Sequence, residues 1–282
     1  MDKLVLDLST YQGTVDFSKM KSAGVEGVIL RCGYTGYGSM LPTTDAKFEA
    51  YYKGASEAGL PIGVYYFTLA TSEELAVKEA NFVLNLVKDK ELLLPIYVDV
   101  EAQNNSVAWT NLSKSDRTKF VAKFCDTIEK AGYYVGIYGS TSWLNNKLDM
   151  SSLKAYDVWV AQYNTRCTYT GNYGMWQYSS KGNGATYGCS STYVDMNHCY
   201  KDYPTIIRKA GLNGYTKTST VKEFKVGAKV KYSGYVYSDS YGVGRGRNVS
   251  GIYEITRYIK GRKCGVHIGS LGWVSESNCK LV

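Results

Sequence analysis

Strand-like and helix-like segments alternate along the first 200 residues of this 282-residue chain, and this alternation constrains the fold more than any other feature. Apolar runs rich in Val, Ile, Leu and Tyr predict strands at 3–9, 25–34, 61–70, 93–101 and 133–140. Between them, apolar residues recur at helical spacing in 16–24, 45–59, 72–90 and 113–132. Repeated βα units predict an α/β fold, an irregular TIM-like barrel with right-handed crossovers.

The pattern changes twice after residue 148. Helical spacing fades first, and 156–163, 173–179 and 191–197 are typical of short strands, which completes a predicted barrel domain over residues 1–205. Residues 206–222 then become rich in Gly, Thr, Ser and Lys, which predicts a linker. Residues 223–282 contain short alternating strands broken by Gly and Ser, which predict a second, small all-β barrel.

The positive charge of the chain lies in this C-terminal part. Residues 220–282 hold 11 Lys and Arg against 4 Asp and Glu, whereas the remainder holds 22 against 21. A basic surface favours polyanions such as wall teichoic acids, nucleic acid or anionic lipid.

Several classes of protein are disfavoured by what the sequence lacks. No stretch approaches the roughly 18 apolar residues of a membrane span, and the first residues lack the pattern of a secretory signal. The seven cysteines are odd in number and without CxxC spacing, so they predict free thiols rather than a disulfide framework or a zinc site. No Gly-rich phosphate loop follows the first strand, and we expect no cofactor.

Acidic residues stand at the ends of three predicted strands: Asp7, Asp99 with Glu101, and Asp195. In β/α barrels the working residues project from one end of the strands, so we expect these four carboxyl groups at one mouth. Asp99 and Glu101 are two residues apart, which places both side chains on one face with α-carbons ~7 Å apart. Repulsion and burial beside aromatic rings then raise the pKa of at least one of them.

Such a pair suits glycosidic cleavage, which needs one protonated acid and one carboxylate. Any single Asp at a strand end is more often a helix cap or a solvated loop residue. The main chemical alternative is a Mg²⁺ or Ca²⁺ site made by the same acids. The two histidines disfavour a zinc site, and we predict no bound metal.

Aromatic and amide side chains near the same strand ends support a sugar substrate. The chain has 27 Tyr, and aromatic faces stack on sugar rings while amides bind sugar hydroxyls. The predicted substrate-binding residues are Tyr65, Phe67, Tyr138, Trp159, Gln162, Tyr163 and Gln177. For each ring taken alone, packing in the barrel core is the commoner role.

Taken together, the motifs over residues 4–200 resemble the glycoside hydrolase family 25 muramidases. The motifs, in chain order, are DLSTYQG, GVYYF, YVDVE, GIYGS, WVAQY, WQYS and VDMN. The resemblance implies an irregular β/α barrel that hydrolyses the β-1,4 bond between N-acetylmuramic acid and N-acetylglucosamine in bacterial peptidoglycan. The chain departs from many relatives at Tyr11, which stands where they carry Trp or His.

The resemblance also implies roles for the acids. Glu101 would be the general acid, and Asp99 its partner, either as nucleophile or by orienting the acetamido group of the substrate. Asp7 and Asp195 would tune protonation and position the sugar. Tyr65, Tyr138, Trp159 and Gln177 match family cleft positions more loosely.

The C-terminal part resembles bacterial SH3-like wall-binding domains in size, strand pattern and a terminal GWV. A barrel followed by such a module is a layout of bacteriophage endolysins, which implies synthesis in the cytosol of an infected bacterium and action on the wall. Four alternatives remain: a bacterial autolysin exported by another route, a non-catalytic wall binder, an enzyme acting on chitin-like glycans, and a nucleic-acid role for the basic module. Nothing in the sequence indicates the oligomeric state.

Overall fold

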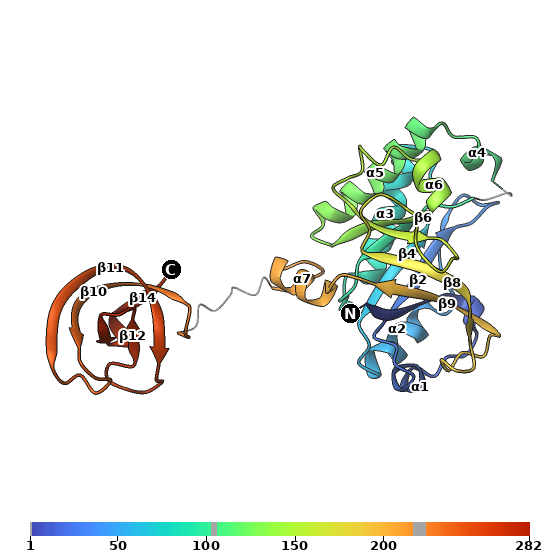
Figure 1. Ribbon diagram of the computed structural model, residues 1–282. Helices are drawn as coiled ribbons and strands as arrows, with labels where there is room; N and C mark the ends of the chain where they lie inside the picture. The colour runs from blue at the N-terminus through green and yellow to red at the C-terminus, as the bar shows by residue number, and fades with distance from the viewer. Residues whose placement is uncertain (1, 103–105, 217–223) are drawn as a thin grey trace. The chain divides into compact units, whose positions relative to one another are not determined.

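The computed structural model describes residues 2–102, 106–216 and 224–282 (Figure 1). The chain divides near residue 218 into two compact units. The predicted strand and helix alternation belongs to the first unit, and the basic, helix-free segment belongs to the second. Each unit is described by itself below.

A closed sheet forms the centre of the first unit. Its strands are β1 (Lys3–Leu8), β2 (Gly27–Thr35), β4 (Ile62–Phe67), β5 (Ile96–Asp99), β6 (Val135–Ser140), β7 (Asp157–Ala161), β8 (Met175–Asn183) and β9 (Tyr193–Cys199). Neighbours from β1 to β8 are parallel, and β9 closes the ring by pairing antiparallel with both β8 and β1. The predicted α/β fold with a barrel-like sheet is confirmed.

Helices cover the outside of this sheet (Figure 1). They are α1 (Phe17–Ser22), α2 (Phe48–Glu57), α3 (Glu73–Val87), α4 (Val107–Thr110), α5 (Lys114–Lys130), α6 (Thr141–Asn146) and α7 (Tyr203–Ala210). A short strand, β3 (Pro42–Thr44), extends the sheet from β2, and a turn of 3-10 helix, η1 (Thr10–Gln12), follows β1. Helices α3 and α5 pack against each other.

Successive side chains along each strand point to opposite faces of the sheet. This alternation in direction separates two hydrophobic cores, one on each face. Val98 joins a large core between sheet and helices. Its neighbour Tyr97 points into the barrel, where it packs with Trp159, Ile29 and Met175. The barrel interior is therefore filled with side chains.

A buried carboxyl group, Glu79 of α3, joins that helix to the ends of two strands. Its oxygens accept hydrogen bonds from the hydroxyls of Thr35 and Thr68 and from the amide of Leu69. Burial nevertheless raises its pKa to about 7. Between the ordinary pKa of 4.5 and about pH 7, the folded state therefore keeps a proton on Glu79 that the unfolded chain has released.

This predicts a pH-dependent contribution to stability. The contribution is fully present below the unfolded pKa and is lost as the pH rises through 7. Relative to Glu79→Gln, the free energy of unfolding should fall by about 3 kcal/mol between about pH 4 and pH 8. Urea unfolding at both pH values measures this difference, with the exposed Glu57→Gln as control; parallel pH profiles for wild type and Glu79→Gln would contradict it.

The first unit continues beyond residue 205, where the linker was predicted to begin. Helix α7 buries Tyr203 and Ile207 in the inner core. Asn213 is buried, and its amide nitrogen donates to the Leu92 carbonyl oxygen at 3.0 Å. Residues 206–216 are thus packed onto the barrel, because their apolar and amide groups find partners that the local composition does not reveal. Residues 217–222 of the predicted linker lie outside the described residues.

The second unit is all-β in its described residues. It contains β10 (Lys229–Tyr237), β11 (Arg245–Tyr258), β12 (Val266–Ile268), β13 (Gly272–Val274) and β14 (Cys279–Leu281), with one 3-10 turn at Glu276–Asn278. Strand β10 pairs antiparallel with β11 on one side and with β13 and β14 on the other. Val230, Ile255 and Val266 centre its separate core. Among the described residues of both units, no helix is long and apolar enough to cross a membrane.

Candidate active site

Two of the predicted acids face each other across paired strands. Asp7 of β1 and Asp195 of β9 are direct partners in the antiparallel register. Asp195 was expected at the carboxyl end of a strand, but it lies near the beginning of β9. Since β9 runs against its neighbours, its beginning lies at the same mouth as the carboxyl ends of the parallel strands. The predicted convergence therefore arises from a reversed strand.

Asp7 is buried and is held by two amide side chains. Gln177 and Asn197 each donate a hydrogen bond to its Oδ2 at 2.9 Å. Burial raises the pKa of Asp7 to about 6, and the two hydrogen bonds limit that rise because they favour the ionised form. Trp159 in turn donates from Nε1 to Oδ1 of Asn197 at 2.7 Å. The Asp7 carboxylate is thus fixed by a network from three other strands.

Asp99 ends β5, in register with Phe67 on one side and Tyr138 on the other. It is 4% exposed, and its Oδ1 has no hydrogen-bond partner among the described residues. Burial, followed by the negative charges of Glu101 and Asp7, raises the pKa of Asp99 well above its usual range. An unpartnered buried carboxyl oxygen is costly. A bound ligand would give Oδ1 of Asp99 the partner that it lacks among the described residues.

Glu101 lies two residues beyond Asp99 and is exposed at the mouth. The loss of bulk water around the carboxyl group raises its pKa, and the charge of Asp7 raises it further. Burial, and then the charges of Asp7 and Glu101, raise the pKa of Asp195 to about 8. The structure therefore brings all four predicted acids into electrostatic contact, and they do not all ionise together at neutral pH.

One cation that the sequence analysis did not single out balances this site. The positive charge of Arg31 in β2 lowers the pKa of both Asp99 and Glu101, which opposes the effects of burial and of the neighbouring carboxylates. Its guanidinium pairs with Asp45 at 2.7 Å and lies over the ring of Tyr11 at 5.1 Å. Asp45 also accepts from the backbone amide of Thr10 at 3.1 Å, which ties this cation to the loop after β1. No local motif reveals the ion pair, since its members belong to different elements.

A second missed group supports the backbone of Glu101. Trp109 is fully buried and donates from Nε1 to the carbonyl oxygen of Glu101 at 2.9 Å. The guanidinium of Arg117 lies over the rings of both Trp109 and Trp143, at 5.3 and 4.9 Å. Arg117 also donates to the Trp109 carbonyl at 2.8 Å. The spacing of Trp109 after YVDVE is the only sequence signal that could have suggested this support.

The predicted substrate-binding residues separate into two groups. Tyr138, Gln162 and Tyr163 line a cavity of about 400 Å³ beside Glu101, a size usual for small-ligand sites. Trp159, Gln177 and Phe67 are at most 8% exposed, so they support the mouth from beneath its surface. Tyr65 is half-buried, and the charges of Asp7, Asp99 and Asp195 all act on its hydroxyl, which places it among the acids.

Hydrogen bonds link the cavity wall to the buried acids. The hydroxyls of Tyr138 and Tyr163 donate to Oε1 of Gln177 at 2.9 and 3.1 Å. The side-chain nitrogen of Gln177 in turn donates to Asp7, so a continuous chain of hydrogen bonds joins the cavity wall to this acid. Gln162 is held by two hydrogen bonds to Thr168, one from its amide and one to its carbonyl oxygen. These side chains are therefore positioned before any ligand arrives.

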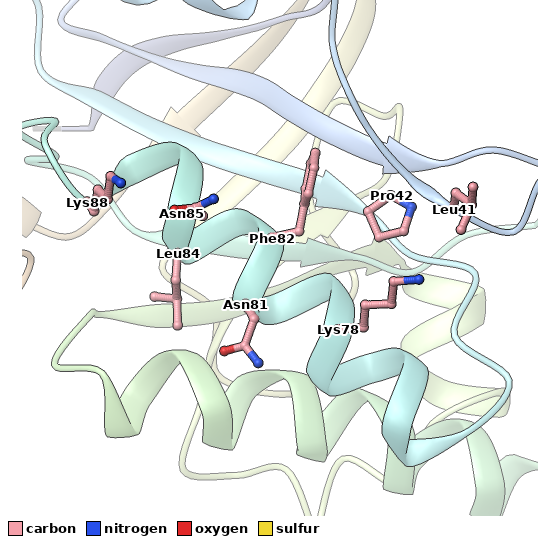
Figure 2. A pocket seen from close by; sticks show the side chains of 8 residues that line it. All are labelled: Leu41, Pro42, Lys78, Asn81, Phe82, Leu84, Asn85 and Lys88. Carbon is pink, nitrogen blue, oxygen red and sulfur yellow. The ribbon is translucent and has the colours of Figure 1, made fainter.

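A larger cavity, of about 680 Å³, lies away from these acids along α3 (Figure 2). Its lining is Leu41, Pro42, Lys78, Asn81, Phe82, Leu84, Asn85 and Lys88. It contains no carboxyl group, so it lacks the chemistry of the barrel mouth. Among the described residues, no three His, Cys, Asp or Glu side chains are placed to share a metal ion.

Removing the amide of Asn197 should destabilise the protein. Asn197→Leu leaves Asp7 with one amide donor and leaves the indole nitrogen of Trp159 without its partner. We expect a loss of about 1–3 kcal/mol in the free energy of unfolding and a pKa of Asp7 above about 6. Urea unfolding measures the loss, with the exposed Asn146→Leu as control, and equal stability of the two variants would refute the network.

Comparison with known proteins identifies the family. Residues 6–186 match the model of glycosyl hydrolases family 25. The chain belongs to this family. The resemblance that the sequence motifs indicate is thereby confirmed.

Individual relatives agree with this assignment. The autolytic lysozyme of Clostridium acetobutylicum is 29% identical over 178 residues, which cover 63% of this chain and 50% of that protein. The modular autolysin LytC of Streptococcus pneumoniae, solved with a synthetic peptidoglycan ligand, is 29% identical with a TM-score of 0.63, over 71% of this chain and 47% of that one. The present chain therefore spans about half the length of these two relatives.

A shorter relative is covered almost completely. The catalytic domain of an endolysin from a Listeria monocytogenes bacteriophage is 26% identical, with a TM-score of 0.57, over 73% of this chain and 97% of that one. The barrel unit of this chain is therefore similar to a domain that was solved alone.

Proposed function

We propose that this protein is a lysozyme, an N-acetylmuramidase that hydrolyses the β-1,4 bond between N-acetylmuramic acid and N-acetylglucosamine in bacterial peptidoglycan. The observation that carries the proposal is that Asp99 is buried, with one oxygen lacking a partner among the described residues, beside the exposed Glu101 at the barrel mouth. Membership of glycosyl hydrolases family 25 and the likeness to an autolytic lysozyme support the same reaction.

In this proposal Glu101 is the general acid. It is exposed beside the cavity, where the leaving oxygen of a bound glycan can reach it, and its raised pKa keeps a proton available. Asp99 acts on the other side of the reaction, as nucleophile or by orienting the substrate acetamido group. Asp7 keeps the local potential negative, which stabilises the positive charge that develops on the sugar ring.

Asp195 and the cavity residues position the substrate. Tyr138, Gln162 and Tyr163 present hydroxyl, amide and aromatic groups to the cavity. With a pKa of about 8, Asp195 carries a proton at neutral pH and donates a hydrogen bond to a sugar oxygen. These groups satisfy the two needs of a sugar ring, an apolar face to stack on and polar edges to bind.

The second unit belongs to this proposal as the part that holds the enzyme on its substrate. We propose that it is an SH3-like wall-binding domain and that the whole chain is a bacteriophage endolysin, made in the cytosol of the infected host. Its positive charge, the seven free cysteines of the chain and the likeness of the barrel to an endolysin domain support this role. Binding to the wall would raise the local concentration of the glycan at the barrel.

Digestion of two polymers side by side tests the reaction. We expect the intact chain to release fragments with muramic acid at the new reducing end from purified peptidoglycan and to leave chitin uncut, as judged by mass spectrometry. Release of acetamido sugars from chitin at a similar rate would replace the substrate with a chitin-like glycan. Firm binding to walls without any release would identify a non-catalytic binder, for which the buried Asp99 has no evident use.

A further inference from the structure

The cations in the described part of the second unit have no carboxylate partners. Among its described residues, no Lys or Arg lies within 4.0 Å of an Asp or Glu oxygen, although the first unit contains eight such ion pairs in its described part. The exposed cations are Lys225, Lys229, Lys231, Arg245, Arg247, Arg257, Lys260, Arg262, Lys263 and Lys280. This charge is therefore free to bind an external anion.

Two of these arginines are held over exposed tyrosine rings. The guanidinium of Arg245 lies 3.5 Å from the ring centre of Tyr235, and that of Arg262 lies 4.0 Å from the ring centre of Tyr241. Tyr241 is 58% exposed. A guanidinium stacked on a ring loses little of its hydrogen-bonding capacity, because its N–H groups point outward in the plane of the group.

Both pairs border one loop, residues 238–244. Arg245 follows this loop directly at the start of β11. On its other side, the loop touches the segment of Arg262, because the backbone amide of Cys264 donates to the carbonyl oxygen of Ser240 at 3.0 Å. The two stacked arginines are therefore parts of one surface, which we call the loop 238–244 surface.

Hydrogen bonds make this loop rigid. Asp239, the one acid in it, accepts at Oδ1 from the backbone amides of Tyr241 and Val243, at 3.0 and 2.9 Å. Gly244 has a φ of 65°, which favours glycine, and a Cβ there would collide with Oγ of Ser238. A preformed loop loses little conformational entropy when a ligand binds to it.

We infer that the loop 238–244 surface binds a phosphodiester-linked polymer of the bacterial wall, of the teichoic acid type. Phosphate accepts two parallel hydrogen bonds from a guanidinium, which matches the two stacked arginines. The exposed Tyr241 and Val243 supply apolar contact for the sugar or polyol units between phosphates. A neutral peptide or glycan would leave this charge unused. The inference deepens the proposed wall-binding role of the second unit and rests on it.

The test compares two charge-matched double variants of the full chain. Arg245→Ala with Arg262→Ala removes the stacked pair, while Lys231→Ala with Lys280→Ala removes the same charge from a register pair between β10 and β14. Binding is measured by sedimentation with purified Gram-positive walls, before and after acid extraction of the phosphate polymer. We expect the arginine variant to bind untreated walls about tenfold more weakly than wild type, and the lysine variant less than about threefold.

Extraction provides the second readout. Wild-type binding should fall on extracted walls to the level of the arginine variant, since the glycan and peptide remain there. Equal wild-type binding to both wall types would overturn the inference in favour of a peptide or glycan ligand. Equal losses in the two double variants would overturn it in favour of general charge attraction, which would also affect DNA. Urea unfolding of both variants confirms that each second unit is folded.

These results are separable from the proposed reaction. Extracted walls still contain the bond that the barrel cleaves, so release of sugar fragments from them reports on the barrel alone. Polymer-dependent binding without any release would support the inference while removing the muramidase proposal. Release without polymer-dependent binding would support the muramidase proposal and overturn the inference about the loop 238–244 surface.

Discussion

Glu101→Gln should lower the rate of peptidoglycan hydrolysis by about a thousandfold. The amide keeps the shape and the hydrogen-bonding reach of the side chain but has no proton to transfer to the leaving oxygen. The Glu101 side chain is exposed and belongs to neither hydrophobic core of the barrel unit. We therefore expect the fold and the affinity for walls to be unchanged, as measured by urea unfolding and sedimentation.

The leaving group provides a sharper test of the same role. In a synthetic aryl glycoside of the substrate sugar, the leaving group is nitrophenolate, which departs without protonation. Glu101→Gln should then approach the wild-type rate of bond cleavage, because the missing proton is no longer needed. Ala108→Ser, at an exposed site in α4, serves as control for changes near this loop. An equal loss on peptidoglycan and on the aryl glycoside would remove Glu101 from the role of general acid.

Asp99→Asn should lower the rate at least about a hundredfold on both substrates. Either proposed role of Asp99 acts on the sugar ring, so a better leaving group does not replace it. One oxygen of Asp99 has no partner among the described residues, and an amide removes the repulsion from Glu101 and Asp7. We therefore expect Asp99→Asn to be at least as stable as wild type above neutral pH, because the pKa of Asp99 is raised in the folded state.

Two measurements separate this role from a structural one. The pH profile of hydrolysis should change in Asp99→Asn, because the variant removes one titrating carboxyl group, whose pKa is raised, from the site. The free energy of unfolding, measured with urea at about pH 8, should not decrease. A folded variant with wild-type activity on both substrates would show that Asp99 takes no part in the reaction.

The acids themselves could be predicted because their positions follow from local periodicity. Asp99 and Glu101 share a face in any strand, and Asp7 ends an apolar run of period two. The closed α/β sheet could be predicted for the same reason, since repeated strand and helix patterns have few other packed solutions. The boundary of the barrel unit could not, because α7 and Asn213 are held by contacts with residues far away in the chain.

The roles of several aromatic residues also depended on packing. Strand composition predicted Trp159 at the mouth, but the side chain is 1% exposed and binds Asn197 within the barrel. Burial depends on which side chains fill the space above a residue, and no local pattern contains that information. Tyr138, Gln162 and Tyr163 were predicted by the same reasoning and do reach the cavity.

The sequence by itself determined which side chains could perform the chemistry, because strand periodicity and the order of the motifs place four carboxyl groups toward one barrel mouth. Only the tertiary structure decided their protonation. The pKa of Asp7 depends on amides that lie 170 and 190 residues away, and Asp195 reaches the mouth because β9 is reversed. Electrostatic energies depend on distance and burial in space, whereas periodicity along the chain specifies only the direction in which a side chain points.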